Sequence, residues 1–510
     1  MSIRHSVLAT LLLTAGLFRV LAEQPTAPAT VPELRQRLSE IISQPKYSAA
    51  FWGVKIVSLD SGSTLFEHHA QKLFSPASNS KLYTVALALD RLGADYKIRT
   101  SLYSPAKPNH RGTLAGDLII YGRGDPTLNA RLHGGDMLQA LEPLVGALTN
   151  AGVRRIDGDL VGDASFFRGS ALGSGWDWDD TEYSYGAEIS ALTINDNVLP
   201  ITVVPGQRVG DCCRVTVGFG GSYLLVTNRT QTVEPGQRPR LSFFRPLNEN
   251  VLYVSGQVPT NAPTREEDIP VHKPAALFVC LFKQALAAHG IVVRGRVRTV
   301  DWQDRQGVPF NPDTCVELAS VESPPMRELA REVEKPSQNL YADLLLSQVG
   351  ENARSVATPP ETTSEDLGLE ELNRFLAEAG VRKGDVWFDE GSGLSRNNLT
   401  TPEATVCLLR YMSHHQCAAD YLNALPIAGV DGTLRNRMKG TAAAGNVRAK
   451  TGSLRWASSL SGYVTSAAGE RLAFSLMLNR YHGAPGTSGR GDLDNIAVLL
   501  AGFTGKSTSP

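Results

Sequence analysis

Three short polar motifs, set far apart in a fixed order, constrain this chain more than any other feature. S-x-x-K at residues 78–81 and S-x-N at 337–339 each stand at the start of an apolar run with helical spacing, and K-T-G at 450–452 lies on a run typical of a strand. Any one motif arises by chance in 510 residues. All three in this order indicate a fold that brings two helix starts and one strand together.

The first motif has the composition of an activated nucleophile. A serine hydroxyl is a poor nucleophile until a neighbouring base removes its proton. Residues three apart on a helix share a face, so Lys81 can reach the hydroxyl of Ser78. Lys81 must be neutral to act as a base, and burial or a nearby cation such as Lys450 favours the neutral form. We therefore predict that Ser78 is the nucleophile and Lys81 its base.

The second motif supplies groups that suit the remaining proton transfers. Ser337 is predicted to relay a proton to the leaving group. Asn339 is predicted to orient Lys81 and to hydrogen-bond an amide of the substrate.

The third motif suits an extended peptide with a terminal carboxylate. A strand offers backbone groups to such a peptide, and Lys450 and Thr451 suit its carboxylate. Gly452 has no side chain, so we expect the substrate to lie close to it. The oxyanion is expected between the backbone N–H groups of Ser78 and Ser453, near a helix N-terminus.

The N-terminus and the composition predict an exported protein. Residues 1–22 read as a signal peptide, with Arg4 ahead of an apolar run and Ala22 at the cleavage site. Arg19 makes the run too short for a membrane span, so the mature chain is expected to have no transmembrane segment and to be periplasmic. A formal net charge of -1 excludes a basic nucleic-acid footprint.

The cysteines permit disulfides without requiring them. Six are present, an even number in a chain predicted to be exported, and Cys407 and Cys417 are close enough in sequence to pair. The adjacent Cys212 and Cys213 are poorly placed to bridge to each other. The sequence HHQC at 414–417 fits no standard zinc spacing, and neither a metal nor a cofactor is expected.

The pattern of helical and strand-like runs changes twice along the chain, and these changes predict nested domains. Helical and strand-like runs near both termini flank a central part rich in short strands, Gly and Pro. The expected division is a catalytic domain at 23–97 and 306–510, an inserted β-rich domain at 98–114 and 190–305, and a smaller domain nested at 115–189. The three motifs all fall outside the insertion, which is therefore expected to take no part in the chemistry.

Beyond the three motifs, several further stretches resemble one family, the DacB-like class C low-molecular-mass penicillin-binding proteins, which are D-alanyl-D-alanine carboxypeptidases/endopeptidases. These stretches are YGRGDPTL at 121–128, GDASFF at 162–167, INDNVL at 194–199, DEGSGLSRNN at 389–398 and GVDGTLRNRM at 429–438. The spacing of 259 residues between Ser78 and Ser337 also resembles that of this family. Many relatives carry Asp or Ser in place of Gln338, a side chain expected to point away from the nucleophile.

The resemblance implies both a fold and a reaction. The fold is α+β: a β-lactamase/penicillin-binding transpeptidase-like domain, with helices packed on an antiparallel sheet, interrupted by a nested, β-rich two-domain insertion. The reaction is that of a serine DD-peptidase, which removes terminal D-Ala from peptidoglycan stem peptides or cleaves D-Ala-diaminopimelate cross-links. β-Lactams are expected to acylate Ser78 and so inhibit the enzyme.

Arg396 and two alternative functions complete the predictions. Arg396 follows a glycine-rich stretch and could bind a second substrate carboxylate through two hydrogen bonds; it could equally be a surface arginine. A β-lactamase or esterase would carry the same three motifs, and a non-catalytic cell-wall-binding protein could retain them.

Overall fold

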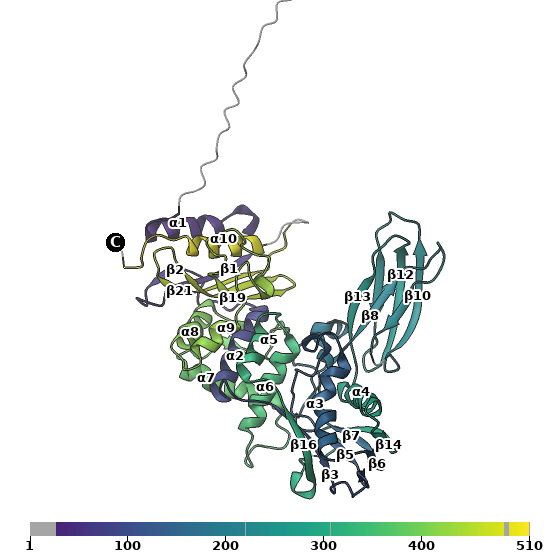
Figure 1. The fold of residues 1–510 in the computed structure, drawn as a ribbon. Coiled ribbons are helices and arrows are strands. Elements are labelled where there is room, and N and C mark those ends of the chain that lie inside the picture. Colours follow the sequence, from purple (N-terminus) through teal and green to yellow (C-terminus); the bar gives the residue numbers. More distant parts are fainter. Residues whose placement is uncertain (1–26, 220, 307, 484–488, 509–510) are drawn as a thin grey trace, which may run out of the picture.

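A five-stranded antiparallel sheet lies at one end of the protein and carries the K-T-G motif (Figure 1). The computed structural model describes residues 27–219, 221–306, 308–483 and 489–508, so the predicted signal peptide lies outside the described residues. The strands, in sheet order, are β19 (Arg448–Leu454), β20 (Ala457–Thr465), β21 (Arg471–Asn479), β1 (Phe51–Ser58) and β2 (Thr64–His68).

Helices cover both faces of this sheet. α1 (Val31–Ile42) and α10 (Arg490–Ala501) pack on one face and share an apolar core with it (Figure 1). α8 (Pro402–Ser413) packs on the other face against β1 and β21. Because both faces are covered, seven of the eight residues of β1 are buried, and the strand reads as a nearly continuous apolar run instead of an alternating one.

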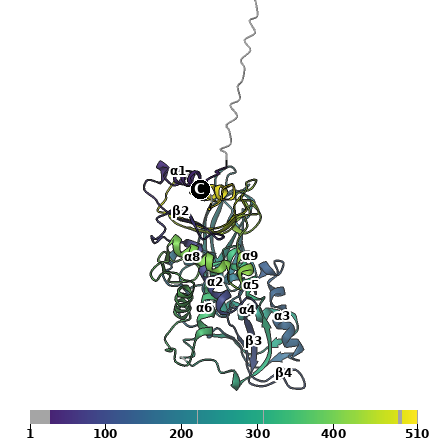
Figure 2. The same ribbon diagram turned by 90° about the vertical axis from the view of Figure 1, so that its left-hand side faces the viewer.

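A group of helices below the sheet carries the other two motifs (Figure 2). Its members are α2 (Ser80–Arg91), α5 (Met326–Glu334), α6 (Asn339–Ala353), α7 (Ser364–Glu378), α8 and α9 (Ala418–Ala424). The sequence predicted a helix that starts at the S-x-x-K motif. Instead, the 3-10 turn η2 (Ala77–Asn79) precedes α2, and α2 is buried on all sides because α5, α6, α7 and α9 surround it.

The central part of the chain forms a second five-stranded sheet, packed with two helices. The sheet order is β15 (Val297–Val300), β7 (Leu160–Asp163), β5 (Leu118–Tyr121), β3 (Arg99–Ser104) and β16 (Val316–Glu322). The helices are α3 (Met137–Asn150) and α4 (Pro274–Ala288). A small sheet of β14 (Val292–Val293), β6 (Arg155–Ile156) and β4 (Thr113–Leu114) lies beside them.

Two three-stranded sheets form a lobe that projects from this central part (Figure 1). One contains β13 (Arg265–Pro270), β8 (Val198–Val204) and β9 (Arg214–Val217). The other contains β10 (Leu225–Val233), β12 (Val251–Pro259) and β11 (Arg240–Phe244). Both pack into the same apolar core as α3 and α4.

Strand pairing differs from the expected domain boundaries. β16 pairs with β3, so the insertion continues past residue 305 to Glu322. The chain returns to the catalytic domain where Ser323 N–H donates to the carbonyl of Ile98 at 2.8 Å. The end of the insertion that lies beside its start is therefore residue 323, not the expected 306. β5 and β7, inside the expected 115–189 domain, pair with the outer strands β3 and β15. We infer that the nested unit is the 198–270 lobe. The local sequence indicates where strands lie, but it does not indicate which distant strands pair with each other.

Two further findings concern membrane-spanning helices and disulfides. None of the described helices is long and apolar enough to cross a membrane. All six cysteines lie in the described ranges and are unpaired, so Cys407 and Cys417 form no disulfide here. Cys417 Sγ instead donates to the carbonyl of Leu89.

Candidate active site

The turn that carries Ser78 is held against the edge of the sheet. The side-chain amide of Asn79 donates to the carbonyl of Lys450 at 3.1 Å and to Ser459 Oγ at 2.8 Å. Ser459 Oγ in turn donates to the carbonyl of Pro76 at 2.6 Å. These bonds fix the S-x-x-K turn beside K-T-G, as the sequence predicted.

Gly452 permits this close approach. A Cβ at Gly452 would lie 2.1 Å from Ser459 Oγ and 2.4 Å from the carbonyl oxygen of Pro76. Both distances are far below van der Waals contact, so no other residue fits without displacement of the turn. The sequence suggested that Gly452 makes room for substrate, whereas the contacts here are with the chain itself.

Lys81 points at Ser78 from the first turn of α2. Its Nζ lies 3.1 Å from Ser78 Oγ, 2.6 Å from Asn339 Oδ1 and 2.6 Å from the carbonyl oxygen of Ser392. The side chain is fully buried. Burial lowers the pKa of Lys81 to about 8, against the opposing effect of nearby acids, of which Glu390 is the strongest. Lys81 is therefore placed, and its pKa shifted, as a base toward Ser78 requires.

Lys450 makes the matching contact with the second serine. Its buried Nζ donates to Ser337 Oγ at 2.7 Å and to the carbonyl of Thr451 at 3.0 Å. Burial lowers the pKa of Lys450 to about 7, Glu334 acts in the opposite direction, and Lys81 lowers it further. Each of these two lysines thus contacts one serine hydroxyl, an arrangement suited to two separate proton transfers.

The S-x-N turn lies between α5 and α6 in a strained conformation. Ser337 has φ = 67°, a left-handed value that is rare for serine. Asn339 begins α6 and uses both ends of its amide: Oδ1 accepts from Lys81, and Nδ2 donates to the carbonyl of Tyr185 at 3.0 Å. Asn339 therefore orients Lys81, and the orientation depends on a residue of the insertion.

The other two residues predicted on this strand, Thr451 and Ser453, differ in exposure: Thr451 is buried in the middle of β19 and Ser453 is exposed. Thr451 Oγ1 donates to Thr433 Oγ1 at 2.9 Å. Ser453 is exposed and pairs with Ser458 of β20. The oxyanion position between Ser78 N–H and Ser453 N–H stays a prediction.

The family model of the D-Ala-D-Ala carboxypeptidase 3 (S13) family matches residues 34–500. The chain belongs to this family. Its members are serine-type hydrolases, and the resemblance predicted from the motifs is confirmed.

Individual relatives agree with this assignment. A D-alanyl-D-alanine carboxypeptidase of Actinomadura sp. (strain R39) is 35% identical over 94% of this chain and 86% of the relative. DacB of Haemophilus influenzae is 27% identical over 83% of this chain and 84% of the relative. The crystal structure of penicillin binding protein 4 (dacB) from the same organism matches with a TM-score of 0.77 at 26% identity, over 91% of this chain and 98% of that one. The predicted α+β penicillin-binding fold is confirmed.

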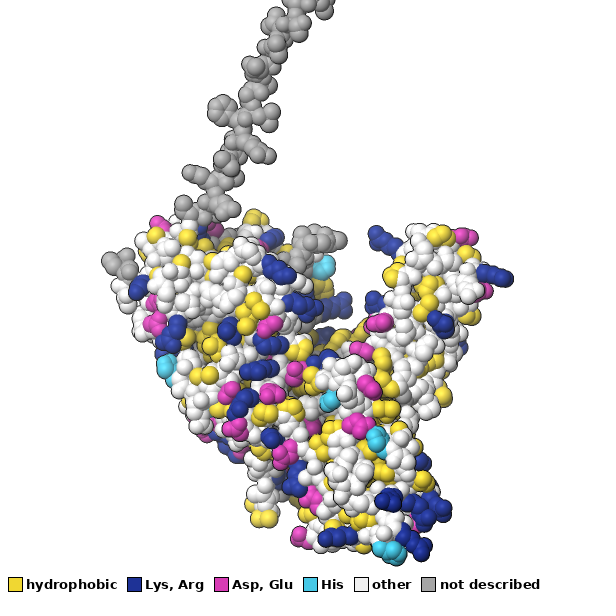
Figure 3. Space-filling model, viewed as in Figure 1, with side chains coloured by type: hydrophobic (Ala, Val, Ile, Leu, Met, Phe, Trp, Pro, Cys, Tyr) yellow, Lys and Arg dark blue, Asp and Glu magenta, His cyan; other side chains and the backbone are white. Residues whose placement is uncertain are grey.

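Arg396 is brought toward the site but already has partners. Its Nη1 lies 2.7 Å from Asp177 Oδ2 and 3.4 Å from Asp180 Oδ2, both on a loop of the insertion. Arg396 also lines a cavity of about 740 Å³ with three further cations, Lys72, Arg455 and Arg480. Figure 3 shows Lys and Arg side chains gathered where the sheet-bearing part faces a wide hollow beside the lobe.

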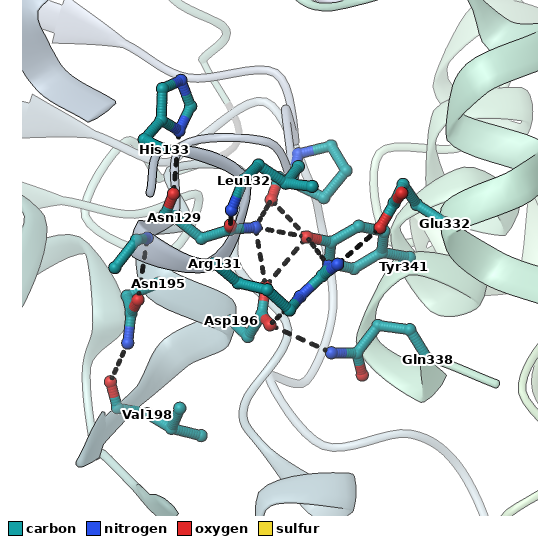
Figure 4. A network of polar contacts seen from close by, with 12 residues as sticks. Asn129, Arg131, Leu132, His133, Asn195, Asp196, Val198, Glu332, Gln338 and Tyr341 are labelled. Atoms are coloured by element: carbon teal, nitrogen blue, oxygen red, sulfur yellow. Dashed lines mark hydrogen bonds and ion pairs between the residues drawn. The ribbon is translucent and has the colours of Figure 1, made fainter. Parts of the chain in front are cut away.

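A polar network joins the S-x-N turn to the insertion and was missed in the sequence (Figure 4). Asp196 accepts from Gln338 Nε2 at 3.2 Å, from Tyr341 Oη at 2.8 Å and from Asn129 Nδ2 at 3.1 Å. Gln338, which the sequence expected to point away from the nucleophile, points toward Asp196. The sequence signal for this network was the polar stretch INDN at 194–197. In the structure its three polar residues all adopt positive φ.

Two further buried acids shape the turn that contacts Lys81. Asp343 Oδ1 accepts from Gly391 N–H at 2.9 Å, and Glu390 Oε2 accepts from Ser392 N–H at 2.7 Å. These bonds present the Ser392 carbonyl to Lys81. Burial, and then the charge of Glu390, raises the pKa of Asp343 well above its usual range. An acid inside the apolar run of α6 was the signal for Asp343.

Proposed function

We propose that this protein is an exported serine DD-peptidase that acts on peptidoglycan stem peptides through a Ser78 acyl-enzyme. The observation that carries the proposal is a pair of buried lysines, each in contact with one serine hydroxyl. Lys81 Nζ lies 3.1 Å from Ser78 Oγ, and Lys450 Nζ lies 2.7 Å from Ser337 Oγ. Membership of the S13 family supports the same substrate class.

The first step is acylation. Ser78 Oγ attacks the carbonyl carbon of the penultimate D-Ala, and its proton passes to neutral Lys81. The N–H groups of Ser78 and Ser453 hold the oxyanion of the tetrahedral intermediate. The intermediate collapses when the C–N bond breaks and the amine takes a proton from Ser337, which regains one from Lys450.

The leaving amine defines two related activities. Terminal D-Ala leaves in the carboxypeptidase reaction, and the side-chain amine of a diaminopimelate cross-link leaves in the endopeptidase reaction. Lys450 and Thr451 bind the substrate carboxylate, and Arg396 binds a second carboxylate after release from its aspartates. Water then attacks the Ser78 ester, the acyl C–O bond breaks, Ser78 regains its proton from Lys81, and the proton released by water returns to Lys450. β-Lactams form the same ester and block the enzyme.

Muropeptide products test the proposal most directly. The chain from residue 23 onward is incubated with muropeptides ending in D-Ala-D-Ala and with cross-linked dimers, and products are identified by mass. Release of D-Ala or of monomers is expected. Ser78→Ala is expected to fold and to form no penicilloyl adduct by intact mass. Rapid turnover of a chromogenic cephalosporin would favour a β-lactamase, and absence of any penicillin adduct on the wild type would favour a non-catalytic wall-binding protein.

Residues 1–22 direct the chain across the inner membrane and are cleaved, which places the enzyme in the periplasm beside its substrate. Expression of the full chain followed by N-terminal sequencing of the mature protein tests this step. A mature N-terminus at or near residue 23 is expected.

A further inference from the structure

Glu334, the last residue of α5, is a carboxylate that the proposed reaction does not use. It is 0% exposed, and neither Oε1 nor Oε2 has a hydrogen-bond partner within the described part of the chain. A buried carboxylate without hydrogen bonds is costly to a fold. Its presence therefore points to an electrostatic role.

Glu334 lies three residues before Ser337, whose Oγ accepts a hydrogen bond from Lys450 at 2.7 Å, so it is close in the chain to the candidate active site. Lys450 of β19 acts on it most strongly, followed by Lys81 of α2. Tyr421 of α9 also faces it and donates its own hydroxyl proton to the carbonyl of Leu82 at 3.1 Å.

The neighbours of Glu334 on its own helix are engaged elsewhere. Glu332 binds Arg131 at 2.7 Å, and Lys335 binds Asp431 at 2.6 Å. These pairs leave Glu334 as the charge of α5 that faces inward.

The two buried lysines differ in their counter-charges. Glu390 and Asp343 act on Lys81 more strongly than Glu334 does. Glu334 is the acid that acts on Lys450, and among the described residues no other does so appreciably. Loss of Glu334 would thus leave Lys450 as a buried ammonium without a counter-charge, a state that favours loss of its proton.

We propose that Glu334 is a positioning residue whose negative charge keeps Lys450 protonated and ready to hold a substrate carboxylate, an inference that rests on the proposed function. Protonated Lys450 also carries the proton that Ser337 passes to the leaving amine. Its charge in turn favours the neutral, basic form of Lys81. Burial raises the pKa of Glu334 to about 7 while both lysines oppose that rise, so the group changes charge within the working range of the site.

The test is the pH profile of acylation by a fluorescent penicillin, which carries a carboxylate. In Glu334→Gln and Glu334→Met the limb that reports loss of the Lys450 proton is expected to move to lower pH by about one unit or more, the usual effect of losing a close opposite charge. The limb that reports Lys81 is expected to move less. Glu334→Asp retains the charge and should restore most of the wild-type profile.

Controls separate this role from a structural one. Glu332→Gln, on the same helix, removes an outward charge and should leave both limbs in place. Glu334→Met breaks no hydrogen bond and has a similar volume, so it is expected to fold with an unchanged or higher melting temperature. Unmoved limbs in folded variants, or failure of Glu334→Met to fold, would overturn the proposal. A wild type that no penicillin acylates would refute the proposed function itself.

Discussion

The side-chain amide of Asn339 donates a hydrogen bond to the backbone carbonyl of Tyr185 at 3.0 Å. This bond joins the S-x-N motif to the insertion, although the sequence predicted that the insertion takes no part in the chemistry. The Asp196 network makes a second connection one residue earlier, at Gln338 (Figure 4). The insertion therefore supports the groups that orient Lys81, and its removal is expected to reduce acylation.

Asp196→Asn tests this connection with little change of backbone. Asp196 has φ = 54°, a conformation that Asn tolerates well. The variant loses the acceptor for Gln338 Nε2 and the negative charge. A charged hydrogen bond contributes about 1.5 kcal/mol, so acylation by penicillin is expected to fall about tenfold.

The matched control is Asp136→Asn. Asp136 also lies in the insertion and caps α3 through Leu138 N–H at 2.9 Å. Asn caps helices as well as Asp does, so acylation and melting temperature should not change. Equal acylation rates in wild type and Asp196→Asn would show that the network only stabilises the insertion.

The meeting of the three motifs was predictable from sequence because it depends on their local spacing and order. Ser78, Lys81, Ser337, Asn339 and Lys450 meet as expected, since two helix starts and one strand suffice to place them. The pairing of strands that lie far apart in the sequence was not predictable. β16 joins the inserted sheet only through its pairing with β3, and nothing in its own residues distinguishes that partner from others.

The buried acids show the same limit at the level of side chains. Glu334 lies in a helix with a strongly polar face, and its spacing alone does not separate it from half-buried Glu332. Only the position of β19 against α5 reveals that one acid faces two lysines while the other faces Arg131.

Gly452→Ala tests the contact between β19 and the Ser78 turn. The added methyl group would overlap the carbonyl oxygen of Pro76 and Ser459 Oγ. Overpacking of this kind costs about 1–3 kcal/mol, and displacement of the turn should reduce acylation at least in proportion. Melting temperature and penicillin labelling are the measurements.

Gly146→Ala serves as the control for that substitution. Gly146 lies within α3, and a Cβ there meets no atom within 4 Å. Alanine is expected to stabilise the helix by about 0.5–1 kcal/mol without any change in acylation. Normal labelling by Gly452→Ala would mean that the turn adjusts and that the glycine is needed for stability alone.

Arg396 is predicted to exchange its aspartates for a substrate carboxylate. Asp177→Asn removes a competing partner, so the KM for a muropeptide with a second carboxylate is expected to fall, whereas Arg396→Gln should raise it. Exposed ion pairs contribute up to about 1 kcal/mol, so each change should be about two- to fivefold. Changes of KM in the same direction for both variants would indicate that the pair acts only to hold the loop.

Lys81 is predicted to set the pH dependence of acylation in the wild type. Its pKa is lowered to about 8, chiefly by burial, and only the neutral amine accepts the Ser78 proton. About a tenth of Lys81 is neutral at pH 7 and about nine tenths at pH 9, so Lys81 alone raises the acylation rate constant about tenfold over that interval. Loss of the Lys450 proton, whose pKa is lowered to about 7, opposes this rise, so the profile is expected to be bell-shaped. Stopped-flow measurement of penicillin acylation gives this profile.

Lys81→Arg completes the test, because Arg keeps the charge but does not lose its proton. Acylation is expected to fall by at least about 10²-fold, the usual contribution of a general base. Lys55→Arg is the control: Lys55 is a buried lysine of β1, paired with Glu67 at 2.7 Å and Glu403 at 2.8 Å, and its replacement should leave acylation unchanged. Near-normal acylation by Lys81→Arg would transfer the role of base to Ser337 and Lys450, which lie 2.7 Å apart on the opposite side of the site.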